Sequence, residues 1–176
     1  MTVVTLTIND ELVSAQEGET LLAVLRERGV DIPTLCHLDG LSPVGACRLC
    51  LVQVEGGARL LPACASEAAE GMVVQTDDPQ LHGYRRMAVE LFFAEGNHVC
   101  AFCVANGDCE LQDMAGVVGL RNVRYGYEGA NHRHDAKDES NPYFTYDPSK
   151  CIVCNRCVRA CEETQGTFAL TISGKG

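Results

Sequence analysis

Four cysteines in one short stretch constrain this chain more than any other feature of its sequence. They lie at Cys36, Cys47, Cys50 and Cys64, with the spacing C-x10-C-x2-C-x13-C. Two cysteines separated by two residues can bind one metal atom, while a third from just upstream and a distant fourth complete the ligand set. We therefore predict that residues 36–64 hold a [2Fe–2S] cluster, and that the rest of the chain continues an electron path from it.

The chain has eleven cysteines among its 176 residues, and three kinds of chemistry could use them. Disulfides need an oxidising compartment, yet the N-terminal sequence MTVVTLTIND has neither the basic nor the apolar region of a signal peptide. An odd number of cysteines also fits a complete disulfide framework poorly. Zinc is the second alternative, but the spacing of the first four cysteines matches no common zinc motif. We therefore favour iron–sulfur clusters.

The composition argues against several classes of partner. The formal net charge is −10, from 24 acidic and 14 basic residues, whereas nucleic acids and anionic membranes bind basic surfaces. No apolar run in the sequence approaches the roughly 20 residues that span a bilayer. We expect a cytoplasmic protein that has no nucleic-acid partner and no membrane span.

The pattern of residues 1–78 predicts a small α+β domain. Two strands of alternating apolar and β-branched residues come first, and an amphipathic helix follows them. After the cysteine loop come a hairpin around Gly56-Gly57 and one further short strand. This order of elements is typical of a β-grasp [2Fe–2S] ferredoxin domain with its cluster at one edge. Gly40 and Gly45, between the cysteines, would adopt positive φ values so that backbone amides can approach sulfur.

A long helix is predicted for residues 79–95, with Asp78 as its N-cap and Pro79 in its first position. Apolar residues recur in it at helical spacing, and we expect this stripe to pack on the modules at both ends. The stripe consists of Leu81, Tyr84, Ala88, Leu91 and Phe92. We expect Arg85 and Arg86 on the solvent-exposed face.

A second group of ligand-type residues follows this helix. It comprises His98, Cys100, Cys103 and Cys109, all within twelve residues. A [4Fe–4S] cluster needs four ligands and only three cysteines are available, so another residue type, water or a partner must supply the fourth. His98 is the local candidate, because an imidazole can replace a thiolate as an iron ligand. Such a replacement raises the reduction potential of the cluster, as in Rieske centres. Zinc held by the same side chains is the alternative. We assign residues 79–120 to this segment.

The third group has the spacing C-x2-C-x2-C-x3-C, which is typical of [4Fe–4S] ferredoxins. It comprises Cys151, Cys154, Cys157 and Cys161. The fourth cysteine of such a run usually binds another cluster, whose remaining ligands come from a second run that this chain lacks. Either Cys161 completes the local cluster, or it serves a cluster missing from this chain, and we expect the chain to be the front part of a longer one. We assign residues 121–176 to a linker and this partial ferredoxin-type segment.

Taken in order, the three groups resemble the N-terminal region of several iron–sulfur subunits, over nearly the whole chain. These are the large subunit of complex I, iron-only hydrogenases, the diaphorase subunit of NAD-reducing hydrogenases, and the large subunit of molybdenum-containing, NAD-dependent formate dehydrogenases. The H-x-C spacing in EGNHVCAFC is similar to the diaphorase and formate dehydrogenase versions, and the tail CIVCNRCVRACEETQGTFALTISGKG most resembles formate dehydrogenase. The resemblance implies the same ligands for the [2Fe–2S] and first [4Fe–4S] clusters as proposed above.

We therefore expect a module that relays electrons between a catalytic site of the formate dehydrogenase type and a flavin- and NAD-binding partner. An electron-transfer subunit of an NAD-reducing hydrogenase, or of a complex I-like enzyme, is the alternative. We assign no catalytic residue, and without a G-x-G-x-x-G motif we expect NAD to bind elsewhere. A zinc-stabilised interaction module is a further alternative. A redox-sensing regulator would need an effector or DNA-binding domain that the sequence does not indicate.

Overall fold

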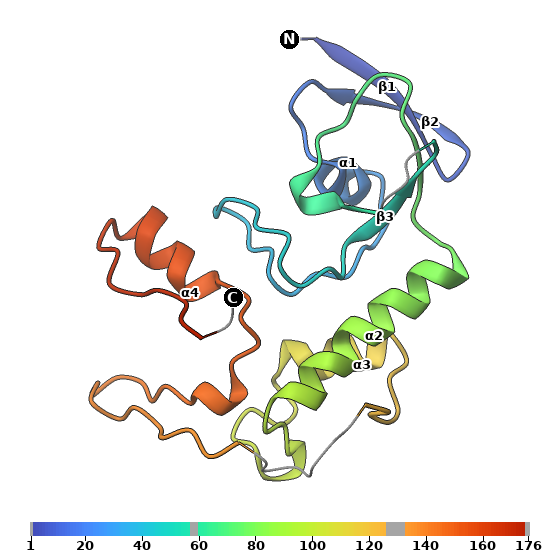
Figure 1. Cartoon of the computed structure of the whole chain (residues 1–176). Coiled ribbons are helices and arrows are strands. Elements are labelled where there is room, and N and C mark those ends of the chain that lie inside the picture. Colours follow the sequence, from blue (N-terminus) through green and yellow to red (C-terminus); the bar gives the residue numbers. More distant parts are fainter. Residues whose placement is uncertain (1, 57–59, 126–132, 175–176) are drawn as a thin grey trace.

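A mixed five-stranded sheet organises the N-terminal part of the computed structural model, which describes residues 2–56, 60–125 and 133–174 (Figure 1). The strands are β1 (Val3–Ile8), β2 (Glu11–Gln16), β3 (Leu51–Val54), β4 (Leu61–Pro62) and β5 (Val73–Gln75), in the order β2-β1-β5-β3-β4. Strand β1 is antiparallel to β2 and parallel to β5, while β3 is antiparallel to β4 and β5. The predicted α+β class and β-grasp order are confirmed.

Helix α1 (Leu21–Glu27) covers the sheet and closes the first hydrophobic core. It begins at Thr20, whose hydroxyl accepts a hydrogen bond from the Ala23 N–H at 3.3 Å and so satisfies one of the free amides at the helix start. Four of its apolar side chains are buried against residues of the strands. Cys50 and Cys64 belong to the same core, so the fold itself brings two of the predicted ligands to the edge of the sheet.

Helix α2 (Pro79–Glu95) begins and ends as predicted, but it buries a different face. The Asp78 carboxylate caps it by accepting from the Gln80 N–H at 2.7 Å. Tyr84 and Leu91 are exposed, and the buried side chains are Leu81, Arg85, Val89 and Glu90. The prediction of Arg85 on the solvent face was wrong, because its guanidinium lies under the sheet and donates to three backbone carbonyls.

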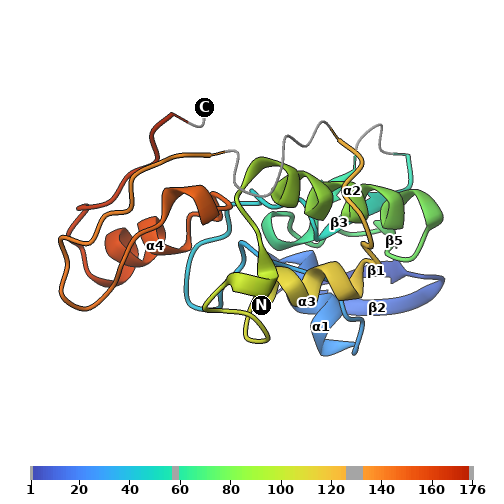
Figure 2. The same cartoon turned by 90° about the horizontal axis from the view of Figure 1, so that it is seen from below.

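The remaining elements surround the loops that carry the other cysteines. Helix α3 (Glu110–Val117) packs beside α2. Helix α4 (Arg156–Arg159) continues into a π-helical turn at Ala160–Thr164 and lies next to the cysteine loop that precedes β3 (Figures 1 and 2). Gly57 of the predicted hairpin and residues 126–132 of the predicted linker lie outside the described residues. No helix in the described part of the chain could cross a bilayer.

Candidate iron–sulfur cluster sites

The four cysteines of the first group meet at one edge of the β-grasp core. Cys36, Cys47, Cys50 and Cys64 are 1–4% exposed. Hydrogen bonds from the Cys47 thiol, and then from the Cys64 thiol, lower the pKa of Cys36 to about 2. Cys64 also donates to Cys50, which lowers the pKa of Cys50 to about 7. The same hydrogen bonds raise the pKa of Cys47 and Cys64, so the four sulfurs form one contacting group, as the ligands of a single cluster must.

The backbone of this loop is shaped to approach sulfur. The Cys47 N–H donates to Cys36 Sγ at 3.4 Å. Gly45 has a φ of +61°, and a Cβ there would also contact the Pro62 ring at 3.4 Å. Arg48 adopts a φ of 59° although it is not a glycine. Successive residues in such conformations turn amide N–H groups toward an anion, so the loop suits a thiolate-bound cluster.

The second group lines a single pocket. Its walls include His98, Cys100, Cys103 and Cys109 together with Phe93. Cys109 is the N-cap residue of α3, so the start of this helix positions the last cysteine of the group. The structure therefore brings together the four side chains that the sequence predicted for the first [4Fe–4S] cluster.

The buried imidazole of His98 fits the role of an iron ligand. Its Nε2 atom is inaccessible to solvent and has no hydrogen-bond partner among the described residues. Burial lowers the pKa of His98, and the positive charge of Lys150 lowers it further. A neutral imidazole keeps a lone pair for a metal, whereas an unused buried nitrogen costs free energy. Phe93 holds the ring edge-on, with 5.5 Å between ring centroids.

In the third group, three of the cysteines lie around a strained loop. The Val153 N–H donates to Cys151 Sγ at 3.4 Å. Val153 and Asn155 have φ values of 55° and 61°, which is unusual for a β-branched residue such as valine and typical of functional loops. Burial raises the pKa of Tyr146, and the neighbouring charges of Cys151 and Cys157 raise it further. Cys151 and Cys157 therefore face the same tyrosine.

Cys161 is directed to different neighbours. Its sulfur lies 2.9 Å from Thr167 Oγ1 and accepts from the Ala169 N–H at 3.2 Å. The hydrogen bond with Thr167, followed by that from Ala169, lowers the pKa of Cys161. These contacts favour the alternative in which Cys161 serves another cluster over the one in which it completes the local set.

The three groups share one hydrophobic core, which we call the junction core. Its buried members are Leu35, Cys36, Cys47, Leu49, Val89 and Leu111, and among the partly buried side chains packed against it are Cys109, Ile152 and Cys154. Each group thus contributes at least one cysteine to the same packed interior. A pocket at its surface is lined by Leu35 from the first loop, by His98 and Cys103 from the second group, and by Cys154 from the third.

Within the described residues, no three His, Cys, Asp or Glu side chains converge as ligands of a single metal ion. The ligands of a cluster bind different iron atoms, so they need not converge on one point. The donor sets of sulfur with one imidazole fit iron–sulfur clusters, because thiolates and imidazoles are the ligands that these clusters take from proteins.

Sequence reasoning missed three arginines near these sites. Arg85 donates to the carbonyls of Leu49 and Leu51 on either side of Cys50. Arg156 and Arg159 extend from α4 to the first cysteine loop. The only sequence signal of Arg156 and Arg159 was their position within the third cysteine run, which does not reveal what an arginine contacts, and Arg85 had no such signal.

Two family models match successive parts of the chain. Residues 1–79 match the family model described as a 2Fe-2S iron-sulfur cluster binding domain. Residues 85–124 match that of the NADH-ubiquinone oxidoreductase-G iron-sulfur binding region. The gamma subunit of the NAD-reducing hydrogenase HoxS from Cupriavidus necator is 34% identical over 97% of this chain and 71% of its own length. The chain belongs to the family of this gamma subunit.

Other relatives of the family show the same region within longer proteins. The mitochondrial 78 kDa subunit of NADH-ubiquinone oxidoreductase from Neurospora crassa is 33% identical over 98% of this chain but only 23% of its own length. A putative formate dehydrogenase of Bacillus subtilis, YrhE, is 30% identical over 91% of this chain and 16% of its own length. The chain thus spans less than a quarter of the length of these two relatives. In a crystal structure of an NAD+-reducing [NiFe]-hydrogenase, one chain matches with a TM-score of 0.89 and 35% identity, over 98% of this chain and 71% of that one.

These matches establish the class of the protein. It carries a [2Fe–2S] and a [4Fe–4S] cluster and is an iron–sulfur electron-transfer module related to subunits of NAD-linked oxidoreductases, as the sequence predicted. The family relatives are subunits of multi-subunit redox enzymes. The zinc interpretation finds no support in them.

Proposed function

We propose that this chain relays electrons through three iron–sulfur clusters, between a flavin- and NAD-binding subunit and a catalytic partner of the formate dehydrogenase type. The junction core is the observation that carries the proposal, because cysteines of all three groups pack into it. Electron transfer through protein slows steeply with distance, so sites that share one packed interior suit a relay.

The ligands follow from the groups described above. The first cluster takes Cys36, Cys47, Cys50 and Cys64, and the second takes His98, Cys100, Cys103 and Cys109. The third takes Cys151, Cys154 and Cys157, with Cys161 as a ligand here or of a cluster beyond this chain. When bound, each cluster accepts and returns one electron. The chain supplies thiolates, a neutral imidazole and an apolar surround that limits access of water.

An electron-transfer subunit of an NAD-reducing hydrogenase is the second candidate for the parent enzyme. The likeness to the HoxS gamma subunit, which extends over 71% of that subunit, favours it. Affinity-tagged chain isolated from its native cells would distinguish the two. Formate-dependent NAD reduction with bound molybdenum would support the first candidate, whereas hydrogen-dependent reduction with bound nickel would support the second.

Magnetic interaction between the clusters tests the relay itself. We expect about six iron atoms per chain from the first two clusters, and about ten if the third assembles. In EPR of the dithionite-reduced protein, the [2Fe–2S] signal should relax faster than in an isolated ferredoxin, because a reduced [4Fe–4S] cluster lies across the shared core. Microwave power saturation of this signal is the measurement.

A Cys109→Ser variant is the matched control for that experiment. It removes a ligand of the second cluster and leaves the first group intact, so the relaxation of the [2Fe–2S] signal should slow. Equal relaxation in both proteins would show that the clusters do not interact and would contradict a relay. A protein that binds only zinc would contradict the cluster assignment altogether.

Replacing His98 with cysteine should lower the potential of the second cluster without destroying it. A thiolate adds one negative charge that the neutral imidazole lacks, and this disfavours the reduced form. We expect a fall on the order of 100 mV, by analogy with the higher potentials of histidine-ligated Rieske centres. Potentiometric titration followed by EPR measures it, and an unchanged potential would show that His98 is not a ligand.

A further inference from the structure

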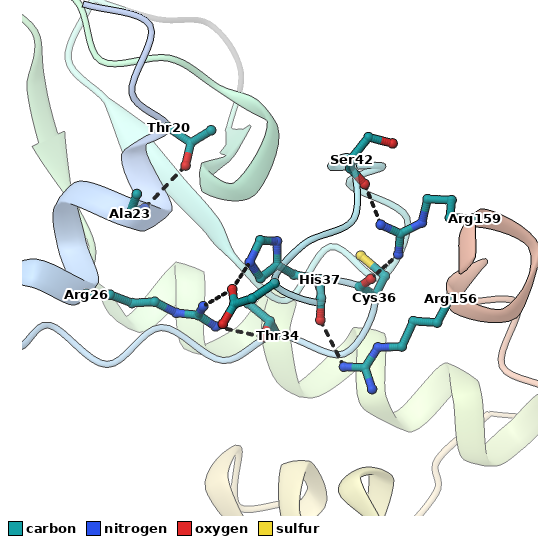
Figure 3. A network of polar contacts seen from close by, with 10 residues as sticks. Thr20, Ala23, Arg26, Thr34, Cys36, His37, Ser42, Arg156 and Arg159 are labelled. Atoms are coloured by element: carbon teal, nitrogen blue, oxygen red, sulfur yellow. Dashed lines mark hydrogen bonds and ion pairs between the residues drawn. The ribbon is translucent and has the colours of Figure 1, made fainter. Parts of the chain in front are cut away.

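A buried arginine on the third segment is hydrogen-bonded to the loop of the first site. Arg159 lies between Cys157 and Cys161 on α4, and its two terminal nitrogens donate to the carbonyls of Ser42 and Cys36 (Figure 3). These partners are 117 and 123 residues away in sequence. The contact therefore exists only in the tertiary structure.

Arg159 forms no ion pair among the described residues, although Glu163 lies near enough for the two charges to interact. The residue is 6% exposed, and within residues 2–56, 60–125 and 133–174 no carboxylate lies within ion-pair distance of it. Its buried Nε atom also lacks a hydrogen-bond partner there. A buried cation is costly unless an anion lies nearby. Cys36 supplies one of the bound carbonyls and is a proposed ligand of the first site, so a cluster there would be a further anion close to Arg159.

The neighbouring Arg156 is different, because its charge is paired. Its Nη1 atom forms an ion pair with Glu110 at 2.7 Å, and its Nη2 atom donates to the His37 carbonyl at 3.0 Å. Figure 3 shows both arginines reaching the same loop from α4. Arg156 thus fastens the third segment to the first loop and is held by an ion pair, while Arg159 binds the same loop and forms no ion pair with a described carboxylate.

We propose that Arg159 is a positioning residue that holds its positive charge against the [2Fe–2S] site and thereby favours the reduced form of that cluster. The inference rests on the proposed ligands of the first site. Reduction moves one electron from a reduced flavin or a neighbouring cluster to a ferric ion, which becomes ferrous, and no bond breaks. Because the cluster gains one negative charge, a nearby cation stabilises the reduced form more than the oxidised form.

Glu163 provides an opposing charge beside the same loop. Its carboxylate accepts from the Ser42 N–H at 2.7 Å and from the Ser42 hydroxyl. These two hydrogen bonds, followed by the charge of Arg159, lower the pKa of Glu163. Removal of this negative charge should therefore shift the potential of the first cluster in the direction opposite to removal of Arg159.

EPR-monitored redox titration of the [2Fe–2S] signal in the full chain tests the proposal. We expect Arg159→Gln to lower the equilibrium constant for one-electron reduction about threefold to tenfold, or roughly 30–60 mV. Arg159→Lys keeps the charge and should stay within about twofold of wild type, and Glu163→Gln should raise the constant. Arg26→Gln is the matched control, because Arg26 pairs with Asp39 of the same loop but makes its hydrogen bonds to the side chains of Asp39 and Thr34 rather than to a predicted ligand.

Equal shifts in Arg159→Gln and Arg159→Lys would overturn the proposal, since a purely structural arginine would be sensitive to shape rather than charge. An unchanged potential in Arg159→Gln would overturn it as well. Should Arg159→Gln fail to assemble the cluster, as shown by its iron content, Glu163→Gln decides in a titration at low ionic strength, because Glu163 is exposed and salt screens its charge. A rise then supports the proposal and no change refutes it. A wild-type protein without a [2Fe–2S] signal would instead contradict the proposed function.

Discussion

Alanine at position 96 should cost the protein its second iron–sulfur cluster. Gly96 ends α2, and a Cβ there would lie 2.4 Å from His98 Nε2, 2.8 Å from His98 Cδ2 and 3.0 Å from the Ser149 carbonyl oxygen. Real side-chain atoms do not approach so closely, and His98 is already confined by Phe93. The imidazole must therefore move away from its position beside Gly96, where it lines the pocket of the second site.

The expected result is a loss of about four iron atoms per chain, or conversion of the second cluster to a form with three irons, while the [2Fe–2S] signal persists. Iron analysis and EPR measure both. Gly83→Ala in the same helix is the control, since a Cβ there meets no atom within 4 Å. That change should stabilise α2 by about 0.5–1 kcal/mol. Full cluster content in Gly96→Ala would show that the His98 ring position is not required.

The second large effect is expected from Arg85→Met. Arg85 donates from Nε to the Leu49 carbonyl at 3.1 Å and from Nη2 to those of Leu51 and Thr76 at 2.8 and 3.1 Å. Methionine fills a similar volume but donates no hydrogen bond, so three carbonyls lose their shared partner. Each buried unsatisfied group costs about 1–3 kcal/mol, and we expect a loss of roughly 3–5 kcal/mol in the free energy of unfolding.

Chemical denaturation monitored by circular dichroism and by cluster absorbance measures this loss. Because Leu49 and Leu51 flank Cys50, the [2Fe–2S] absorbance should disappear at lower denaturant concentration than in wild type. The matched control is Arg86→Met, in the next position of α2, where the side chain is exposed and makes a single hydrogen bond to Val118. Equal stability of the two variants would show that Arg85 does not hold the loop.

Burial lowers the pKa of Arg85, while the nearby charges of Cys50 and then Asp77 raise it. The buried guanidinium is thus partly compensated by the first site itself. Arg85 thus connects helix α2 with the sheet and with the first cysteine loop. These contacts also explain why an arginine stands on the buried face of α2, where a stripe of apolar residues was expected.

Local features of this protein could be predicted from the sequence because they depend on residues close together along the chain. The caps at Thr20 and Asp78 act within three residues. The spacing of the first four cysteines and the grouping of His98 with three cysteines likewise predicted which side chains would gather. The β-grasp order followed from strand and helix patterns, which are also local.

Only the tertiary structure decided how these parts meet. Helical periodicity indicates that α2 has an apolar stripe, but the surface on which the helix packs determines which of its residues are buried. Here Arg85 is buried because its guanidinium donates to three backbone carbonyls. The junction core contains Cys36, Cys109 and Cys154, whose positions in the sequence are related by no spacing rule. The same holds for Arg159, whose contacts cross more than half of the chain. Short motifs thus indicate the candidate ligands, while the connection between the sites and the charge around them depends on long-range packing.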